Sequence, residues 1–180
     1  GIKGSYGRFN AASLEGFVSG PLSDTLKGRI AARGERGDGW QESITRDDKL
    51  GKVRKFAGRA MLEWEPDSDF RALLNVNGWK DRSDTQAPQL VKIVPTNPAV
   101  PPFFFVGSAP VATGNARSAD WDKNTDFDQN AWFYQGSLRL EYDVADDVTL
   151  TSLTAYSKFR NRSVHEADGI GYSPALGRDI

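Results

Sequence analysis

The sequence predicts an all-β fold, an antiparallel up-and-down meander of about six or seven strands, on three observations. Apolar and polar residues alternate along several segments, which is the period of a strand with two different faces. Short acidic turns near residues 21–25, 66–69 and 144–147 separate consecutive segments. Long polar stretches near residues 36–54 and 82–130 join the strands at their other ends. Tight turns along one rim and long loops along the other are typical of outer-membrane β-barrels.

The alternation can be followed from strand to strand. The pattern is weak over residues 14–19, where Phe17 falls among the polar positions, and becomes clear over 26–33, 56–65, 70–77 and 132–143. The last segment, from Val148 to about Arg162, alternates poorly, although its Thr and Ser residues favour β-structure. The expected greasy positions are Leu26, Gly28, Ile30, Ala32, Phe56, Gly58, Ala60, Leu62, Trp64, Phe70, Ala72, Leu74, Val76, Trp132, Tyr134, Gly136, Leu138, Leu140 and Tyr142.

Composition removes several classes of protein. The 180 residues include no cysteine, so disulfide frameworks and thiolate sites are excluded, and a net charge of −1 argues against a general nucleic-acid binder. No apolar run approaches the roughly 18 residues of a membrane-spanning helix. A barrel is compatible with the low mean hydropathy of −0.53, because its strands are apolar only at alternate positions.

Three details favour a membrane barrel over a soluble sandwich. The pattern from Lys55 to Glu65 is near the roughly 9–11 residues that a tilted strand needs to cross a bilayer. Small residues sit among the greasy positions, where a close-packed core would need filling. Large aromatics flank the aliphatic band at both ends, as in the girdles of a barrel. They are Trp64, Phe70 and Tyr142 beside the short turns, and Trp40, Trp79, Trp132 and Tyr134 near the long loops.

Several segments resemble the opening barrel strands of TonB-dependent outer-membrane receptors. They lie at residues 4–10, 15–26, 37–40, 58–66 and 150–156, in an order and spacing that cover nearly the whole chain. The resemblance implies a segment of a large transmembrane β-barrel in the bacterial outer membrane, of about 22 strands with a plugged lumen. It places the short turns in the periplasm and the long loops outside. The plug and the segment that contacts TonB are then expected before Gly1, and further strands after Ile180.

The function that this resemblance implies is active uptake of a scarce nutrient, such as a ferric siderophore, a cobalamin-like compound or an oligosaccharide. The expected partners are that small-molecule ligand, with a metal chelate among the candidates, TonB through the plug region, and outer-membrane lipid. Candidate ligand contacts near the outer mouth are Trp79, Arg82, Phe104 and Trp121. The side chains expected to face the lumen are Lys27, Arg29, Arg33, Arg59, Glu63, Arg71 and Arg139. The chain alone is not expected to transport.

Two alternatives remain open at this point. One is a passive porin or a structural outer-membrane barrel without energy coupling. The other is a soluble β-sandwich or a secreted carbohydrate-binding module, in which the greasy face is an interior. The proline-rich stretch from Pro95 to Pro110, with Phe103, Phe104 and Phe105 at its centre, is predicted to be an outer loop that either contacts ligand or anchors itself.

No pattern supports catalysis or a cofactor, and we predict that the protein is not an enzyme. The single histidine, His165, is expected at the surface, and Gly34–Gly39 lacks the ending of a phosphate-binding loop. Oxygen ligands recur at every second position from Asp120 to Asp128, a spacing that Ca²⁺ uses, but Thr125 and Ala131 replace the glycine and glutamate of an EF-hand. We therefore interpret this stretch as a solvated acidic loop and predict no metal site.

Overall fold

The computed structural model describes residues 1–94, 97, 99, 109–112 and 114–171. Its chain folds into two compact units, each built from three separate stretches of sequence. The first, the sheet unit, comprises Gly1–Arg36, Arg54–Arg82 and Asn130–Arg162. The second, the loop unit, comprises the described residues of 37–53, 83–129 and 163–171.

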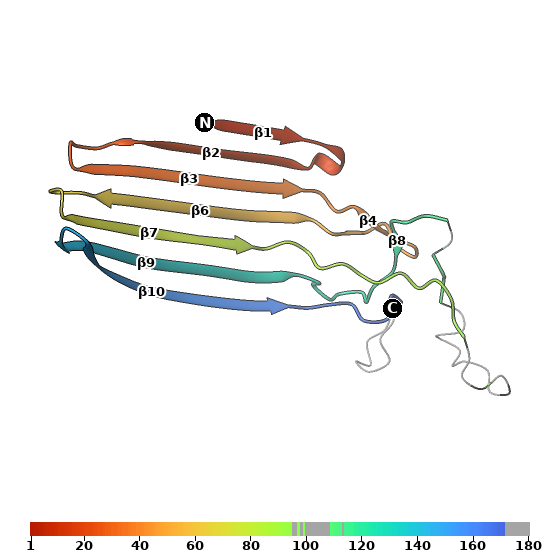
Figure 1. Ribbon diagram of the computed structural model, residues 1–180. Coiled ribbons are helices and arrows are strands. Elements are labelled where there is room, and N and C mark those ends of the chain that lie inside the picture. Colours follow the sequence, from red (N-terminus) through yellow and green to blue (C-terminus); the bar gives the residue numbers. More distant parts are fainter. Residues whose placement is uncertain (95–96, 98, 100–108, 113, 172–180) are drawn as a thin grey trace. The chain divides into compact units, whose positions relative to one another are not determined.

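The sheet unit is an antiparallel sheet of seven strands in which spatial order follows chain order (Figure 1). Its strands are β1 (Ile2–Tyr6), β2 (Ala12–Pro21), β3 (Leu26–Gly37), β6 (Val53–Trp64), β7 (Phe70–Asp81), β9 (Gln129–Ala145) and β10 (Val148–Ser163). The predicted all-β meander is therefore confirmed. The sheet is open, with β1 and β10 at its edges, and its closure into a barrel stays a prediction.

Short turns join the strands along one rim, as predicted. Residues 22–25 connect β2 to β3, residues 65–69 connect β6 to β7, and only Asp146 and Asp147 separate β9 from β10. The last turn is shorter than predicted because Val144 and Ala145 still belong to β9. At the opposite rim a single turn of 3₁₀ helix, Arg8–Asn10, joins β1 to β2, with positive φ at Phe9 (61°) and Asn10 (51°). Among the described residues, no helix is long and apolar enough to cross a membrane.

One regularity of the pairing decides which side chains share a face. In every register recorded between neighbouring strands, even-numbered residues lie opposite even-numbered residues. Leu74, for example, lies opposite Leu62 on one side and Leu138 on the other. Because side chains alternate along a strand, even positions form one face of the sheet and odd positions the other. The predicted greasy positions are all even and thus share a face.

The loop unit has its own small sheet, which the sequence did not predict. Its strands β4 (Gln41–Ser43), β5 (Lys49–Leu50) and β8 (Ser118–Ala119) are ordered β5-β4-β8. β4 and β5 are antiparallel neighbours, whereas β4 and β8, about 75 residues apart in the chain, run parallel. The stretches predicted as long loops therefore include a compact, hydrogen-bonded body.

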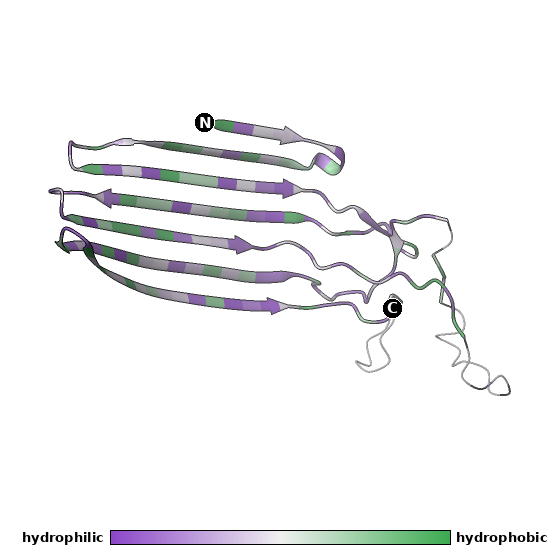
Figure 2. Cartoon of the chain, in the orientation of Figure 1, coloured by the Kyte–Doolittle hydropathy of each residue, from purple (hydrophilic) through white to green (hydrophobic). Residues whose placement is uncertain are grey.

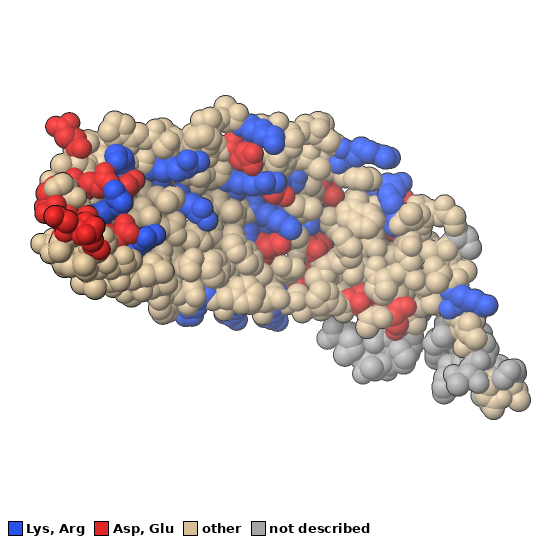
Figure 3. Space-filling view, in the orientation of Figure 1, with Lys and Arg blue, Asp and Glu red and all other residues tan. Residues whose placement is uncertain are grey.

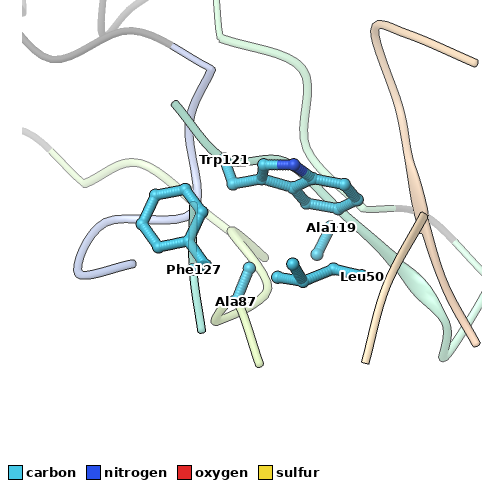
Figure 4. Packing of buried hydrophobic residues seen from close by; sticks show 5 residues of the cluster. All are labelled: Leu50, Ala87, Ala119, Trp121 and Phe127. Atoms are coloured by element: carbon cyan, nitrogen blue, oxygen red, sulfur yellow. The ribbon is translucent and has the colours of Figure 1, made fainter. Parts of the chain in front are cut away.

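The hydrophobic core lies in the loop unit. Leu50, Ala87, Ala119, Trp121 and Phe127 pack together there (Figure 4), with Val164 against them. Among the described residues, every buried one except Ala131 belongs to the loop unit. The sheet unit is consequently a single layer, with both faces exposed.

Candidate functional site

The even-numbered face of the sheet, which we call the apolar face, is the larger candidate interaction surface. Figure 2 shows the alternation of hydropathy along the strands that produces it. Ile30 and Phe56 are 62% and 60% exposed, and Leu74 in the middle of the sheet is 40% exposed. Further large hydrophobic residues on this face with exposed side chains include Leu14, Val18, Leu62, Trp64, Val76, Tyr134, Leu138 and Tyr142. None of the even-numbered positions in the seven strands carries Asp or Glu.

Aromatic side chains lie at both ends of the apolar face. Beside the short turns, the rings of Trp64 and Phe70 meet edge to face at 5.8 Å, and Phe70 lies opposite Tyr142 on the next strand. At the other end, Trp132 stacks on Tyr134 at 5.5 Å. Tyr134 in turn contacts Tyr156 of β10 at 6.2 Å. The apolar face therefore ends in an aromatic row at each rim.

Two aromatics predicted for these rows lie elsewhere. Trp79 occupies an odd position, so the strand alternation places it on the opposite face, where it contacts Phe133 at 6.3 Å and Phe159 at 5.9 Å. Trp40 belongs to the loop unit. The prediction used the distance from the strand end and ignored the period of two that decides which face a side chain occupies.

The odd-numbered face, the charged face, carries a network of ion pairs at its short-turn end. Glu65 accepts hydrogen bonds from Lys27 Nζ at 2.7 Å and Arg71 Nε at 2.6 Å. Arg71 also lies 3.6 Å from Glu141, which pairs with Arg139. Figure 3 shows acidic side chains gathered at this end and basic ones over the middle of the strands. The hydrogen bonds from Lys27 and Arg71 lower the pKa of the Glu65 carboxyl to about 2.

All seven side chains predicted to face a lumen lie on the charged face, since each has an odd number. Apolar residues also occur there. Phe17 is one, and its ring lies under the Arg29 guanidinium at 4.4 Å, which explains a phenylalanine among polar positions. That this face lines a lumen stays a prediction.

The structure divides the predicted ligand contacts between the two units. Trp79 is 39% exposed on the charged face, and Arg82 is exposed just beyond β7, with its amide donating to the Arg54 carbonyl at 2.9 Å. Trp121 is in the loop unit and only 3% exposed, and its ring packs in the hydrophobic core. Phe104, like the neighbouring phenylalanines of the proline-rich stretch, lies outside the described residues.

Asp120 is fully buried, which contradicts its prediction as part of a solvated acidic loop. Its carboxylate accepts hydrogen bonds from Ser43 Oγ at 2.8 Å and Thr45 Oγ1 at 2.7 Å. Arg46 Nη1 lies 3.7 Å away. Burying a carboxylate requires such partners, and they are supplied by residues 75 and 77 positions earlier in the chain. Sequence spacing alone carries no signal of this contact.

The remaining acids of the stretch do not assemble a metal site. Asp126 and Asp128 are exposed, and in the described part of the chain no three His, Cys, Asp or Glu side chains are placed to hold a metal ion. Asp122 instead approaches a distant carboxylate, as its amide donates to Glu166 Oε2 at 3.1 Å. His165, beside Glu166, is exposed.

Glu166 and Asp168 form a second acidic contact in the loop unit. Glu166 Oε1 accepts hydrogen bonds from the amides of Ala167 and Asp168 at 2.8 and 3.0 Å. Partial burial, together with the neighbouring Glu166, raises the pKa values of both Asp122 and Asp168. Local sequence patterns do not predict the approach of Asp122 to this pair, because Asp122 and Glu166 are 44 residues apart.

Comparison of the chain with protein-family models, with curated proteins and with solved structures found no significant match.

Proposed function

We propose that the chain forms part of the wall of a bacterial outer-membrane β-barrel that takes up a scarce nutrient by active, TonB-dependent transport. The apolar face contacts lipid and the charged face lines a wet interior. The observation that carries this proposal is a single-layer sheet with two chemically opposite faces and no core of its own.

The exposed area of the apolar face argues that something must cover it. Burying one large hydrophobic side chain is worth roughly 1.5–3 kcal/mol, so the half-exposed ones named above leave on the order of 10 kcal/mol unrealised in water. A domain is stable by only about 5–15 kcal/mol in total. The sheet therefore needs another apolar surface against its apolar face in order to be stable. Lipid is such a cover, and so is the second sheet of a sandwich.

Strand length and the aromatic rows favour lipid. β6 and β7 each have 12 residues, and β9 and β10 have 17 and 16. A tilted strand needs about 9–11 residues to cross a bilayer, whereas strands of soluble sheets usually have about five or six. Aromatic rows at both ends of an aliphatic band suit the two interfaces of a membrane, where amphipathic rings are stable. A sandwich interior requires no such segregation.

The resemblance to TonB-dependent receptors supports the finer part of the proposal, which is the coupling to TonB and the class of nutrient. Ferric siderophores, cobalamin-like compounds and oligosaccharides are the candidate ligands. The ion pairs of the charged face suit a water-filled interior, since hydrated ion pairs need no costly desolvation and a barrel interior is polar.

Quenching of tryptophan fluorescence by brominated lipid tests the membrane contact. The chain is refolded into phosphatidylcholine vesicles as two variants in which every tryptophan but one is replaced by Phe, leaving either Trp64 or Trp79. We expect brominated acyl chains to quench Trp64 and to leave Trp79 largely unquenched, since the two lie on opposite faces. Equal quenching of both, or of neither, contradicts the proposal.

Uptake measurements test the energy coupling. Cells expressing the gene that encodes this chain are given radiolabelled ferric siderophore, cobalamin or maltooligosaccharide, with and without a protonophore. Active transport predicts accumulation of one compound that stops when the proton gradient is dissipated. Accumulation that is indifferent to the protonophore supports the passive porin instead.

A further inference from the structure

Basic side chains gather at one end of the apolar face, at the strand ends opposite the short turns. We call them the basic row: Arg36, Arg54, Lys80, Arg82, Lys158, Arg160 and Arg162. All seven are exposed. They belong to β3, β6, β7 and β10, or directly follow β7, so the row extends over most of the sheet.

Pairing geometry puts these residues on one face. Lys80 lies opposite Phe56 on one side and Trp132 on the other, and both belong to the apolar face. On β10, Lys158 Nζ lies 5.9 Å from the centre of the Trp132 ring, which fixes the face of the even positions that follow. The hydrogen bond from the Arg82 amide to the Arg54 carbonyl continues the β6–β7 pairing for one more step.

None of the seven strands carries an acidic residue on the face of the basic row. Acidic residues of the strands, such as Glu35, Asp81 and Glu141, occupy odd positions and lie on the charged face. Within the part of the chain that the structure describes, none of the ion pairs involves Lys80, Lys158 or Arg160. The opposite rim, by contrast, carries the acidic turns with Asp24, Asp67 and Asp146.

We propose that the basic row binds the phosphate groups of membrane lipids in the leaflet that faces away from the short turns. Lys80 lies level with Trp132 of the aromatic row, and Arg54 and Arg82 lie one step further from the short turns along their strands. This matches the order of layers in a leaflet, where acyl chains meet the interface and then the phosphates. Long basic side chains reach such phosphates while their stems remain against apolar surface. Arg adds paired hydrogen bonds to phosphate oxygens. This inference rests on the proposed membrane location.

Flotation of the chain with vesicles of phosphatidylcholine, with or without phosphatidylglycerol, tests it. The variant Lys80→Gln/Lys158→Gln/Arg160→Gln removes three members of the basic row. The matched control, Arg29→Gln/Arg59→Gln/Arg139→Gln, removes the same charge from the charged face. We expect the wild-type chain to prefer anionic vesicles, and the row variant to lose about 100-fold of that preference, given roughly fivefold for each basic side chain at an anionic surface. The control is expected to change it by less than about twofold.

Several outcomes overturn the inference. Equal losses in the two variants mean that only net charge matters, and an unchanged preference in the row variant means that the row does not contact lipid phosphate. Inorganic phosphate that abolishes the preference at constant ionic strength identifies a site for free phosphate instead. Quenching of Trp64 in vesicles of phosphatidylcholine alone, measured in parallel, separates the two proposals. If Trp64 is quenched but the chain shows no preference for anionic lipid, the phosphate contact is contradicted and the membrane location is still supported.

Discussion

Lys27 Nζ lies 2.7 Å from Glu65 Oε2, although the two residues are 38 positions apart. Lys27 is the second residue of β3 and Glu65 the first residue after β6, so this ion pair joins two hairpins at the short-turn rim. The amide of Glu65 also donates to the Thr25 carbonyl at 2.8 Å. The turn after β6 is thereby tied to the turn before β3 by one charged and one backbone contact.

This pair predicts a specific loss of stability in acid. The pKa of Glu65 is lowered to about 2 in the folded chain, first by Lys27 and then by Arg71. A carboxyl with a depressed folded pKa stabilises the fold above its unfolded value, near 4.5, and that contribution disappears as the pH falls towards 2. In Glu65→Gln we expect the urea midpoint of the micelle-bound chain to be lower at pH 6, and its decrease between pH 6 and 3 to be smaller than in the wild type. A parallel decrease in both chains contradicts this role.

The sheet was predictable because its signals are local. Alternation and short turns lie within a few residues of one another, and Leu62 and Leu74 face the same way whatever the rest of the chain does. The loop unit was not predictable, because its contacts join distant segments. Gln41 Nε2, for example, donates to the Ala87 carbonyl at 2.7 Å, and the Ala87 amide donates to Gln41 Oε1. No periodicity records such a contact.

The candidate site shows the same division. The period of two correctly predicted which residues form the apolar face. Predictions based only on proximity to a loop put Trp79 on the wrong face and made the buried Trp121 a ligand contact. An aromatic residue after an acid looks the same in sequence whether it covers a core or meets a ligand. The difference arises from packing against Leu50 and Phe127, which lie on other segments.

Removing the buried carboxylate of Asp120 is expected to destabilise the loop unit. In Asp120→Ala the hydroxyls of Ser43 and Thr45 lose their acceptor, and Arg46 loses the carboxylate that lies 3.7 Å from its Nη1. Breaking a buried charged contact in this way costs about 3–5 kcal/mol. Hydrogen exchange of the Ile44 amide, which bonds to the Ala119 carbonyl, measures the loss within this unit.

Asp126→Ala is the matched control for Asp120→Ala. Asp126 lies in the same acidic stretch but is exposed, so we expect a change within about 0.5 kcal/mol. If the two substitutions accelerate exchange of the Ile44 amide equally, the buried hydrogen bonds of Asp120 do not stabilise the unit.

The acidic contact of Glu166 with Asp168 predicts the opposite pH dependence from that of Glu65. Burial, followed by the neighbouring Glu166, raises the pKa of Asp168 above its usual 3.8. The folded chain then holds this proton more tightly than the unfolded chain, so stability falls as the pH rises from 3.8 through the raised value. Asp168→Asn is expected to slow exchange of loop-unit amides at pH 7, after correction for intrinsic rates, and to have little effect below pH 3.8. A destabilised variant at pH 7 contradicts the assignment.

Two glycines with positive φ separate the cost of backbone strain from the cost of a clash. Gly51 has φ +90°, and a methyl group there meets Trp40 Nε1 at 2.6 Å, while Gly114 has φ +73° and nothing within 4 Å. Gly114→Ala is therefore expected to lower the free energy of unfolding by about 1 kcal/mol, which is the cost of the left-handed conformation alone. Gly51→Ala adds displacement of the rigid indole ring, and we expect at least about 3 kcal/mol. Exchange of the Trp40 amide, which bonds to the Leu50 carbonyl at 3.0 Å, reports the difference. Similar costs at the two positions mean that the Trp40 ring moves aside freely and does not hold Gly51 in place.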